Sequence, residues 1–548
     1  MKNKLLLIIF LASLSTSAYN QAKNRYFVYF TDKTGENYSY TIDSPEAFLT
    51  QRAIDRREKQ GIDIDNTDLP VHPEYVDGLR ATGVEVFFTS RWINGSLINA
   101  QENQISSVSA LEFVDSIALI ANGTRLTFET NIPDDPIEFL EPASVGGDSD
   151  IQLAMLGADD MHSDNIKGQG MRIAVLDNGY RGVNQYTPFQ HLWENDRIIA
   201  TKDFVSNSGN VFQYGDHGTS VFSIISSNFV SATGNLYGTA YEAEFILCIT
   251  EDNEDENRVE EYNWLLGAEY ADSLGADVIN GSLGYRVFDI DEHNYTFEDM
   301  DGKSNVVAYA ATKAAEKGII VVVSAGNEGN KSWKRITPPA DAIGILTVGS
   351  VDPDFSYSGF SSVGPTADGR IKPDVAAFGS NTAVVRGSGN IVRGSGTSFA
   401  SPLIAGFAAG IWQANPDWTS EEVIQAIKNS GHRNHSPDTL RGWGVPNYWY
   451  AVNGETALNV EDILEDKVTV YPNPFNGDTL YLITEGKFKK GMNIKVIDPK
   501  GSMVYNKAFK KKDIKENMEL NIDGSQQGVY FLFLQIGNNQ KIVKLINF

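Results

Sequence analysis

This chain has a single cysteine, no long hydrophobic run and no excess of basic residues. Its 548 residues include one cysteine, Cys248, so no internal disulfide can form. Cys248 lies in the apolar run 245–249, which predicts a buried strand residue rather than a nucleophile. The net charge is −26, whereas nucleic acids and anionic membranes bind basic surfaces. The composition therefore argues against a nucleic acid or a charged membrane as partner.

The N-terminus carries an apolar run of about ten residues. A basic start at residues 1–4 is followed by an apolar stretch from Leu5 to Leu14 and then by small residues. This order is typical of a secretory signal peptide, and the run is too short for a permanent membrane helix. We expect residues 1–22 to be a signal peptide, cut after Ala18 or Ala22. No later run is long enough to predict a transmembrane helix.

The remaining chain is long enough for several domains, and its pattern of apolar and polar residues changes twice. Residues 23–145 alternate short strands and helices, among them a polar stretch of helical spacing from Ser44 to Gln60. They end in a linker rich in Pro, Asp, Glu and Gly. This first segment predicts a small α+β module followed by an exposed connection.

The second segment, residues 146–460, alternates fully apolar runs with helical stretches. It predicts an α/β fold, a doubly wound parallel sheet with helices on both faces, whose functional residues gather at the carboxyl ends of the strands. The third segment, residues 461–548, has short alternating strands and predicts a small antiparallel β-sandwich. From Lys467 onward the chain holds 13 Lys and 7 acidic residues, a net charge of +6 against −32 for the remainder. This contrast favours a separate module.

Four short motifs carry candidate chemistry, and each has an ordinary structural explanation when it is taken alone. Asp177 ends an apolar strand before Asn-Gly, and His217 lies in GDHGTS before a helical run; either would suit a turn. Ser398 lies in GSGTSFASP at the start of an apolar helix, where it could be a cap or lie in the positive end of the helix dipole. Pro402 is expected in the first turn of that helix, where proline is tolerated. Asn327 follows another apolar strand and could donate an amide N–H to a developing oxyanion.

Together these motifs resemble the subtilase family of serine proteases. The resemblance covers about residues 151–453 and rests on VLDNG, DHGTS, SAGNEG and GTSFASP, in the order Asp, His, Asn, Ser. It implies a catalytic triad in which Ser398 is the nucleophile, His217 its base, and Asp177 the group that orients the imidazole. Asn327 and the backbone N–H of Ser398 would form the oxyanion hole.

The same resemblance implies a substrate cleft lined by two extended segments. These are Ser282-Leu283-Gly284 and Ser324-Ala325-Gly326, which would pair with a peptide as added strands. Thr337 is a candidate for the floor of the side-chain pocket. The acidic run from Glu251 to Glu256 could favour basic substrates, although a solvated loop is the simpler explanation. No cofactor is expected for the chemistry; the acidic loops are compatible with a structural Ca²⁺, but no metal ligands can be assigned.

The flanking modules also resemble parts of exported proteases. The first resembles subtilase propeptides, which assist folding and block the cleft until they are cut off, here between about residues 140 and 150. The last resembles the C-terminal sorting domain of the type IX secretion system, on the sequences VYPNP at 470–474 and GVYF at 528–531. That implies a Gram-negative bacterium and a product that is released or anchored at the cell surface. A permanent β-sandwich that binds carbohydrate or protein is the alternative.

The sequence thus predicts a secreted serine endopeptidase, made as a zymogen and processed at both ends, that acts on proteins or peptides as a monomer. Its other partners would be its own propeptide and the type IX secretion machinery. Two further functions stay open: a catalytically inactive surface protein that keeps the fold for binding, and a processing protease with a narrow target. The presence of all three triad residues and of Asn327 favours an active enzyme.

Overall fold

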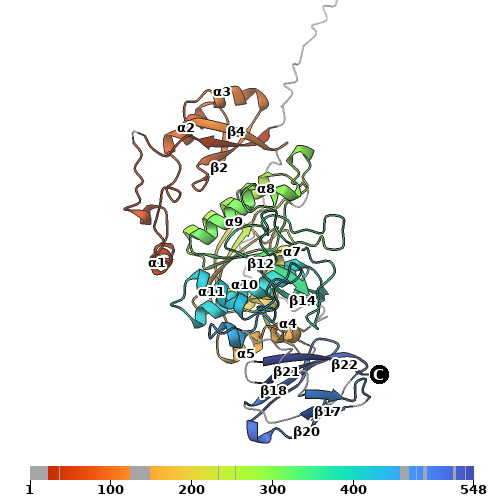
Figure 1. Ribbon diagram of the computed structural model, residues 1–548. Helices are drawn as coiled ribbons and strands as arrows, with labels where there is room; N and C mark the ends of the chain where they lie inside the picture. The colour runs from red at the N-terminus through yellow and green to blue at the C-terminus, as the bar shows by residue number, and fades with distance from the viewer. Residues whose placement is uncertain are drawn as a thin grey trace, which may run out of the picture.

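The computed structural model of the protein describes three stretches of the chain, 23–123, 148–456 and 468–547, apart from residues 36, 232–233, 253–254, 477, 485–489, 523–525 and 537–538. The predicted signal peptide and the linker lie outside the described residues, as does most of the region where propeptide cleavage is expected. Figure 1 shows three bodies in chain order: a small N-terminal module, a large central domain and a C-terminal β-structure.

A four-stranded antiparallel sheet forms the N-terminal module, in the order β2-β3-β1-β4. Because side chains alternate along a strand, Tyr26 and Val28 pack into the module's own core, whereas Phe27 faces outward and contacts Tyr262 of the central domain. The elements are β1 (Asn24–Phe30), α2 (Pro73–Ala81), β2 (Glu85–Ser90), β3 (Gly95–Ala100), η2 (Glu102–Gln104), α3 (Ile105–Ser109) and β4 (Val114–Ala121).

One helix of this module lies apart from its sheet. The stretch from Ser44 to Gln60, predicted as one helical segment, forms a short 3-10 turn, η1 (Pro45–Ala47), and then helix α1 (Gln51–Gln60). Figure 1 shows α1 well away from the strands, beside the central domain. The helix is therefore a second point at which the N-terminal module reaches the rest of the protein.

A parallel seven-stranded sheet organises the central domain, in the order β13-β12-β11-β10-β5-β9-β6. Its strands are short and almost entirely buried, which explains their continuous apolar character. They are β5 (Arg172–Asp177), β6 (Ile198–Asp203), β9 (Glu244–Ile249), β10 (Val278–Gly281), β11 (Ile320–Ser324), β12 (Leu346–Val351) and β13 (Val375–Phe378).

Helices cover both faces of this sheet. Strand β5 sends Ile173 and Val175 into one core and Ala174 and Leu176 into the other. The first core is closed by α7 (His217–Ser226) and α10 (Thr397–Ala414), and the second by α8 (Val259–Ser273) and α9 (Val306–Glu316). The predicted α/β fold, a parallel sheet with helices on both faces, is confirmed.

Shorter elements complete the central domain. The insertion at residues 288–304 folds into it, since Phe288 and Tyr295 are buried in the core beneath α8 and α9. The remaining elements are α4 (Asp150–Ala154), α5 (Ala158–Ser163), η3 (Thr187–Phe189), α6 (Gln190–Glu194), β7 (Asn228–Ser231), β8 (Gly234–Tyr237), η4 (Asp291–His293), η5 (Phe297–Asp299), β14 (Thr382–Val385), β15 (Ile391–Gly394), α11 (Ser420–Asn429) and α12 (Tyr448–Ala451).

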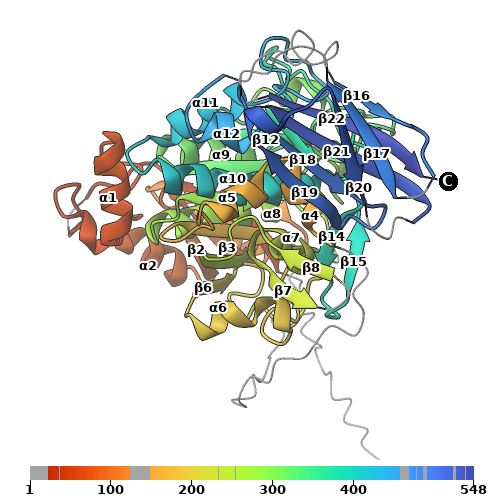
Figure 2. The same cartoon turned by 90° about the horizontal axis from the view of Figure 1, so that it is seen from below.

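Two antiparallel sheets form the C-terminal body, in the orders β16-β17-β20 and β19-β18-β21-β22. They enclose a core of their own, as predicted for a β-sandwich. The body lies against α4 and α5 (Figure 2), where Lys495 Nζ forms ion pairs with Asp159 at 2.6 Å and Asp160 at 3.0 Å. Its elements are β16 (Val468–Tyr471), β17 (Thr479–Thr484), β18 (Met492–Ile497), β19 (Met503–Phe509), η7 (Lys511–Asp513), β20 (Asn517–Asn521), β21 (Gly528–Ile536) and β22 (Asn539–Asn547).

Among the helices that the structure describes, none combines the length and the apolar composition required to cross a membrane.

Candidate active site

Asp177 is the last residue of β5 and is fully buried at the carboxyl edge of the parallel sheet. Its Oδ1 accepts two hydrogen bonds, from the backbone N–H of Asn178 and from Nδ1 of His217, both at 2.8 Å. A carboxylate in this position fixes the imidazole tautomer that carries its proton on Nδ1 and leaves Nε2 as the basic nitrogen. The strand end and the histidine are therefore coupled by one short, charge-assisted contact.

His217 is the first residue of α7, and its side chain is 34% exposed. The imidazole lies near the ring of Phe399, with a centroid separation of 6.2 Å and an interplanar angle of 27°. Phe399 follows Ser398 in α10, so the ring contact brings the histidine next to the start of that helix. The exposed part of the imidazole remains open to an incoming group.

A glycine after the histidine allows α7 to approach β5 this closely. A Cβ atom on Gly218 would lie 2.3 Å from the carbonyl oxygen of Gly179 and 2.9 Å from Cβ of Asp177. The backbone N–H of Gly218 also donates to Oδ1 of Asn178 at 3.1 Å. Any larger residue at position 218 must push the helix away from the strand.

Opposing effects act on the protonation of His217. Burial disfavours its charged form, but the negative charge of Asp177 and their hydrogen bond outweigh burial and raise the pKa of His217 above its usual value of 6.5. A base with a raised pKa accepts a proton more readily. Its neutral form, which is the one that can act as a base, also becomes protonated at a higher pH.

Ser398 is the second residue of α10 and is 8% exposed. Its Oγ donates to the carbonyl oxygen of Ser282 at 3.2 Å, and Oγ of Ser282 donates back to the carbonyl oxygen of Ser398 at 3.1 Å. Among the described contacts, Ser398 Oγ has no hydrogen bond with His217. This exchange of hydrogen bonds fixes the start of α10 against the end of β10.

The position of Pro402 explains why the carbonyl of Ser398 is free to accept a hydrogen bond from Ser282. It also corrects the prediction that Pro402 lies in the first turn of the helix. Helix α10 begins at Thr397, so Pro402 lies inside the helix and not in its first turn. Proline has no N–H, so it leaves the carbonyl four residues earlier, that of Ser398, without its helical partner. The hydroxyl of Ser282 occupies this carbonyl instead.

Two residues that sequence reasoning did not select support Ser282. Nδ2 of Asn280 donates to Oγ of Ser282 at 3.1 Å, and Oγ of Ser401 donates to Oδ1 of Asn280 at 2.8 Å. Asn280 and Ser401 are both buried. Each lies within a motif of the family pattern, GADVINGSLG or GTSFASP, but nothing in the motifs shows that the two side chains meet.

Asn327 lies in the loop that follows β11, and its side-chain oxygen is already engaged. Oδ1 accepts from the backbone N–H of Thr397 at 2.9 Å and from its hydroxyl at 3.0 Å. A Cβ on Gly396 would lie 3.7 Å from Nδ2 of Asn327, 3.8 Å from its Oδ1 and 3.7 Å from the backbone nitrogen of Ser398. The amide of Asn327 and the N–H of Ser398 therefore both lie close to Gly396.

The two predicted cleft segments leave the sheet side by side. Residues 282–284 follow β10 and residues 324–326 end β11, and these strands are neighbours in the sheet. Between them lies Thr337: a Cβ on Gly284 or on Gly326 would lie 2.5 or 3.1 Å from its Oγ1. Thr337 thus packs against both segments, and its role as a pocket floor stays a prediction.

Other candidates have structural explanations. Cys248 is fully buried in β9, and burial raises the pKa of its thiol, so it has the environment of a core residue. In the acidic run, Glu251 accepts a hydrogen bond from Tyr285, and burial raises its pKa to about 8, whereas Asp255 and Glu256 are exposed. Within the described ranges, no group of three or more His, Cys, Asp or Glu residues is arranged to hold a metal ion. A structural Ca²⁺ stays a prediction.

Comparison with known proteins identifies the family to which the chain belongs. The profile of the subtilase family matches residues 168–444, which includes all three triad candidates. The chain belongs to the subtilase family. Two more profiles match beside it: the Bacteroidota propeptide domain of S8 peptidases at residues 25–133, and the secretion system C-terminal sorting domain at residues 469–547. The sorting domain confirms the prediction of type IX secretion in a Gram-negative organism.

Individual relatives of this subtilase are distant. Serine protease AprX of Bacillus subtilis is 29% identical over 317 residues, covering 53% of this chain and 68% of the relative. Subtilisin NAT of Bacillus subtilis subsp. natto is 28% identical over 283 residues, covering 51% of this chain and 65% of the relative. The solved structure of MycP1 from the ESX-1 type VII secretion system has 24% identity and a TM-score of 0.44, over 57% of this chain and 88% of that one. The chain thus spans about two thirds of the length of these two sequence relatives.

The raised pKa of His217 predicts the acid limb of activity. A base must be neutral, so kcat/KM for a peptide substrate should fall as the pH drops through a value above 6.5. A pH–rate profile from pH 5 to 9 measures this effect, and a wild-type profile that stays flat down to pH 5 would contradict the assignment.

Replacing Asp177→Asn should lower kcat by about 10⁴-fold, as loss of the triad carboxylate does elsewhere. Steady-state kinetics of this variant beside the wild type measure the effect.

The close approach at Gly218 predicts a second effect. Gly218→Ala should move His217 away from Asp177 and lower kcat by about 100-fold, because an ångström of misplacement can cost that much. Gly209→Ala is the matched control, since a Cβ there meets no atom within 4 Å. Steady-state kinetics of the two variants test the idea; equal activity would show that the helix accommodates the methyl group.

Proposed function

We propose that this subtilase is a secreted serine endopeptidase that cleaves proteins through an acyl-enzyme on Ser398 and is made as a zymogen processed at both ends. The observation that carries the proposal is the 2.8 Å contact between His217 Nδ1 and Asp177 Oδ1, made where the starts of α7 and α10 meet. The family membership supports a serine peptidase. The roles of the individual residues are inferred from their geometry.

In the proposed mechanism, the Ser398 hydroxyl turns from the carbonyl of Ser282 towards Nε2 of His217. The imidazole takes the hydroxyl proton as Oγ attacks the scissile carbonyl, and later gives it to the leaving amine. Asp177 stabilises the imidazolium formed in between. Such catalytic hydrogen bonds are often long or misaligned before substrate binds, which agrees with the present position of Oγ.

The oxyanion of the tetrahedral intermediate would occupy the space beside Gly396. Nδ2 of Asn327 and the N–H of Ser398 both border that space, and the oxygen of the Asn327 amide is held by Thr397. The amide is therefore oriented before substrate arrives, which is what makes such donors effective in the transition state.

Substrate would lie as an added strand between residues 282–284 and 324–326, with the side chain before the scissile bond in the pocket above Thr337. Its hydroxyl gives the floor a polar group, and Gly284 and Gly326 carry no side chains that would fill the space. The two extended segments, which leave neighbouring strands of the sheet, support peptides as the substrate class.

Loss of the nucleophile should stop maturation. We expect the wild-type precursor to shed its propeptide over time, and the Ser398→Ala precursor to stay intact. Intact-mass measurements of the two purified precursors under the same conditions decide the matter. If neither precursor is processed and neither hydrolyses peptides, the protein is not an active protease.

Removal of the amide donor should slow turnover without preventing folding. Asn327→Ala should lower kcat by about 10²- to 10³-fold, a magnitude measured for one such donor in subtilisin. Asn330→Ala, an exposed asparagine three residues away, is the control and should retain wild-type kcat. An Asn327→Ala variant as active as this control would remove Asn327 from the mechanism.

A further inference from the structure

The N-terminal module contacts the catalytic domain at two separate places. Its sheet packs on α8 through apolar contacts, such as Phe27 against Tyr262 at a centroid separation of 4.7 Å. Helix α1 packs instead against the loops that follow α8 and α9, where the N–H of Thr50 donates to the carbonyl of Ser273 at 2.9 Å. Nε2 of Gln60 likewise donates to the carbonyl of Gly318 at 2.8 Å.

The second place lies at the opposite edge of the sheet from the triad. Residues 273–277 lead into the amino end of β10, and residues 317–319 lead into the amino end of β11. The triad residue Asp177 and the two cleft segments lie at the carboxyl ends of the same set of strands. Helix α1 therefore binds a surface that a substrate in the cleft does not touch.

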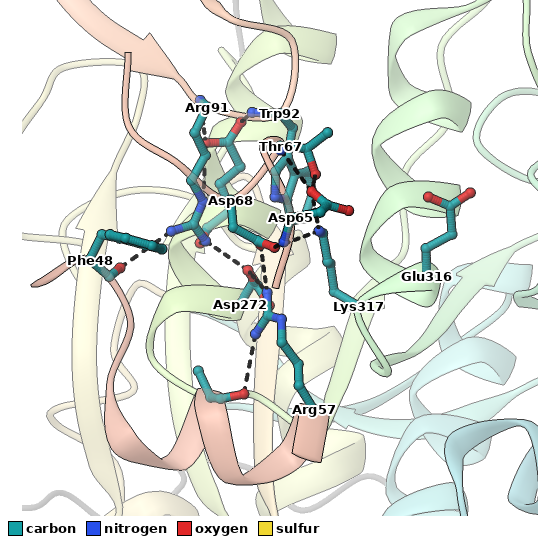
Figure 3. Close-up of polar contacts among 12 residues, drawn as sticks. Phe48, Arg57, Asp65, Thr67, Asp68, Arg91, Trp92, Asp272, Glu316 and Lys317 are labelled. Atoms are coloured by element: carbon teal, nitrogen blue, oxygen red, sulfur yellow. Dashed lines mark hydrogen bonds and ion pairs between the residues drawn. The ribbon is translucent and has the colours of Figure 1, made fainter. Parts of the chain in front are cut away.

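A buried ion cluster joins the two domains at this second place (Figure 3). Asp272 near the end of α8 is fully buried, and three arginines of the N-terminal module bind its carboxylate; Figure 3 labels two of them, Arg57 and Arg91. The contacts are 2.5 Å for Arg56, 2.8 Å for Arg57 and 2.7 Å for Arg91. The side chains of Arg56 and Arg57 are themselves only 3% and 1% exposed.

Further pairs across the same boundary extend the cluster. Lys317 of the catalytic domain pairs with Asp68 at 2.8 Å and Asp65 at 3.2 Å, and Asp68 also binds Arg57 at 3.0 Å. Glu269 accepts from the backbone N–H of Arg91 at 3.0 Å. Buried charges are stable only when they are paired, so loss of either partner leaves an uncompensated charge.

The C-terminal ends of α8 and α9 also favour cations bound to this surface of the catalytic domain. Nε of Arg52 donates to the carbonyl of Gly275 at 3.0 Å, Nη1 of Arg56 to that of Ala276, and Nε of Arg56 to that of Lys317 at 3.3 Å. These carbonyls lie just beyond the C-termini of α8 and α9, where the helix dipole is negative. The side chain of Arg52 also pairs with Asp277.

We propose that these groups form an arginine exosite, a surface of the catalytic domain made of Glu269, Asp272, Asp277 and the carbonyls of residues 273–276. Its ligand is an arginine-bearing helix with the spacing i, i+4, i+5, supplied in this chain by Arg52, Arg56 and Arg57 of α1. The exosite holds the propeptide independently of the cleft, so the propeptide stays bound after the linker is cut. Only this last consequence rests on the proposed zymogen function.

Mild acid does not discharge the central carboxylate of the exosite. Burial disfavours its ionised form, but the charges of Arg57, Arg56 and Arg91 outweigh burial and hold the pKa of Asp272 at about 2, below its usual value of 3.8. A carboxyl with a lowered pKa contributes to the contact above its usual pKa, and that contribution is lost only as the pH falls towards 2. Burial instead raises the pKa of Glu269, so acid neutralises this carboxylate of the exosite before it neutralises Asp272.

The test uses the full-length Ser398→Ala precursor, so binding is measured without catalysis. A recognition sequence for a site-specific protease is placed between residues 123 and 148 and cut, and the sample is diluted and followed by native mass spectrometry. We expect the propeptide to stay bound, and the additional change Arg56→Met with Arg57→Met to speed its dissociation by at least about 100-fold. Arg80→Met is the matched control, because Arg80 forms only an exposed pair with Asp77 in the same module.

A second measurement avoids variants that fail to fold. A labelled peptide of residues 44–72 is titrated onto the processed enzyme, with a copy carrying methionine at both arginine positions as its control. We expect saturable binding of the first peptide, at least about 100-fold weaker binding of the second, and undisturbed hydrolysis of a small substrate. The exosite is ruled out if both peptides bind alike, if the peptide competes with substrate, or if the nicked arginine variant keeps its propeptide as long as the Arg80→Met control.

Discussion

The active centre depends on how closely α7 can approach the carboxyl end of β5. The hydrogen bond from His217 to Asp177 exists because position 218 carries no side chain and the helix can begin almost on top of the strand. The same edge receives the start of α10, fixed by the exchange of hydrogen bonds between Ser282 and Ser398. Two helix starts and two strand ends thus converge on one point, and each is held there by hydrogen bonds in which short side chains take part.

Much of this convergence could be predicted from the sequence, because short local patterns indicate where these strands end and these helices begin. An apolar strand followed by Asp-Asn-Gly, or a glycine-rich turn before an apolar helix, indicates where a strand ends or a helix begins. In a parallel sheet the carboxyl ends lie at one edge, so the motifs predicted that Asp177, His217 and Ser398 would gather there. The two cleft segments were implied by the resemblance to subtilases, and the structure shows that they leave neighbouring strands, β10 and β11.

Other features depend on partners that are distant in the sequence. Ser282 and Ser398 are separated by 116 positions, and Arg57 and Asp272 by 215, so no local pattern could pair them. Pro402 was placed wrongly because α10 begins without a side-chain cap, which left the start of the helix uncertain by a turn. The stretch from Ser44 to Gln60 is polar with helical spacing, and only the carboxylate at the end of α8, distant in the sequence, explains why Arg56 and Arg57 are buried.

The chemistry of the two propeptide contacts suits the proposed zymogen, whose propeptide would have to leave after processing. With a single cysteine the chain cannot link its domains by a disulfide. A wholly apolar second contact would leave an exposed hydrophobic patch on the mature enzyme, which favours aggregation. An ion cluster behaves differently, because Asp272, Glu269 and Lys317 regain water when their partners leave. Buried ion pairs are costly to break one partner at a time, but both halves are soluble once they separate. The cluster can therefore bind the propeptide tightly and still leave a polar, hydrated surface on the catalytic domain after separation.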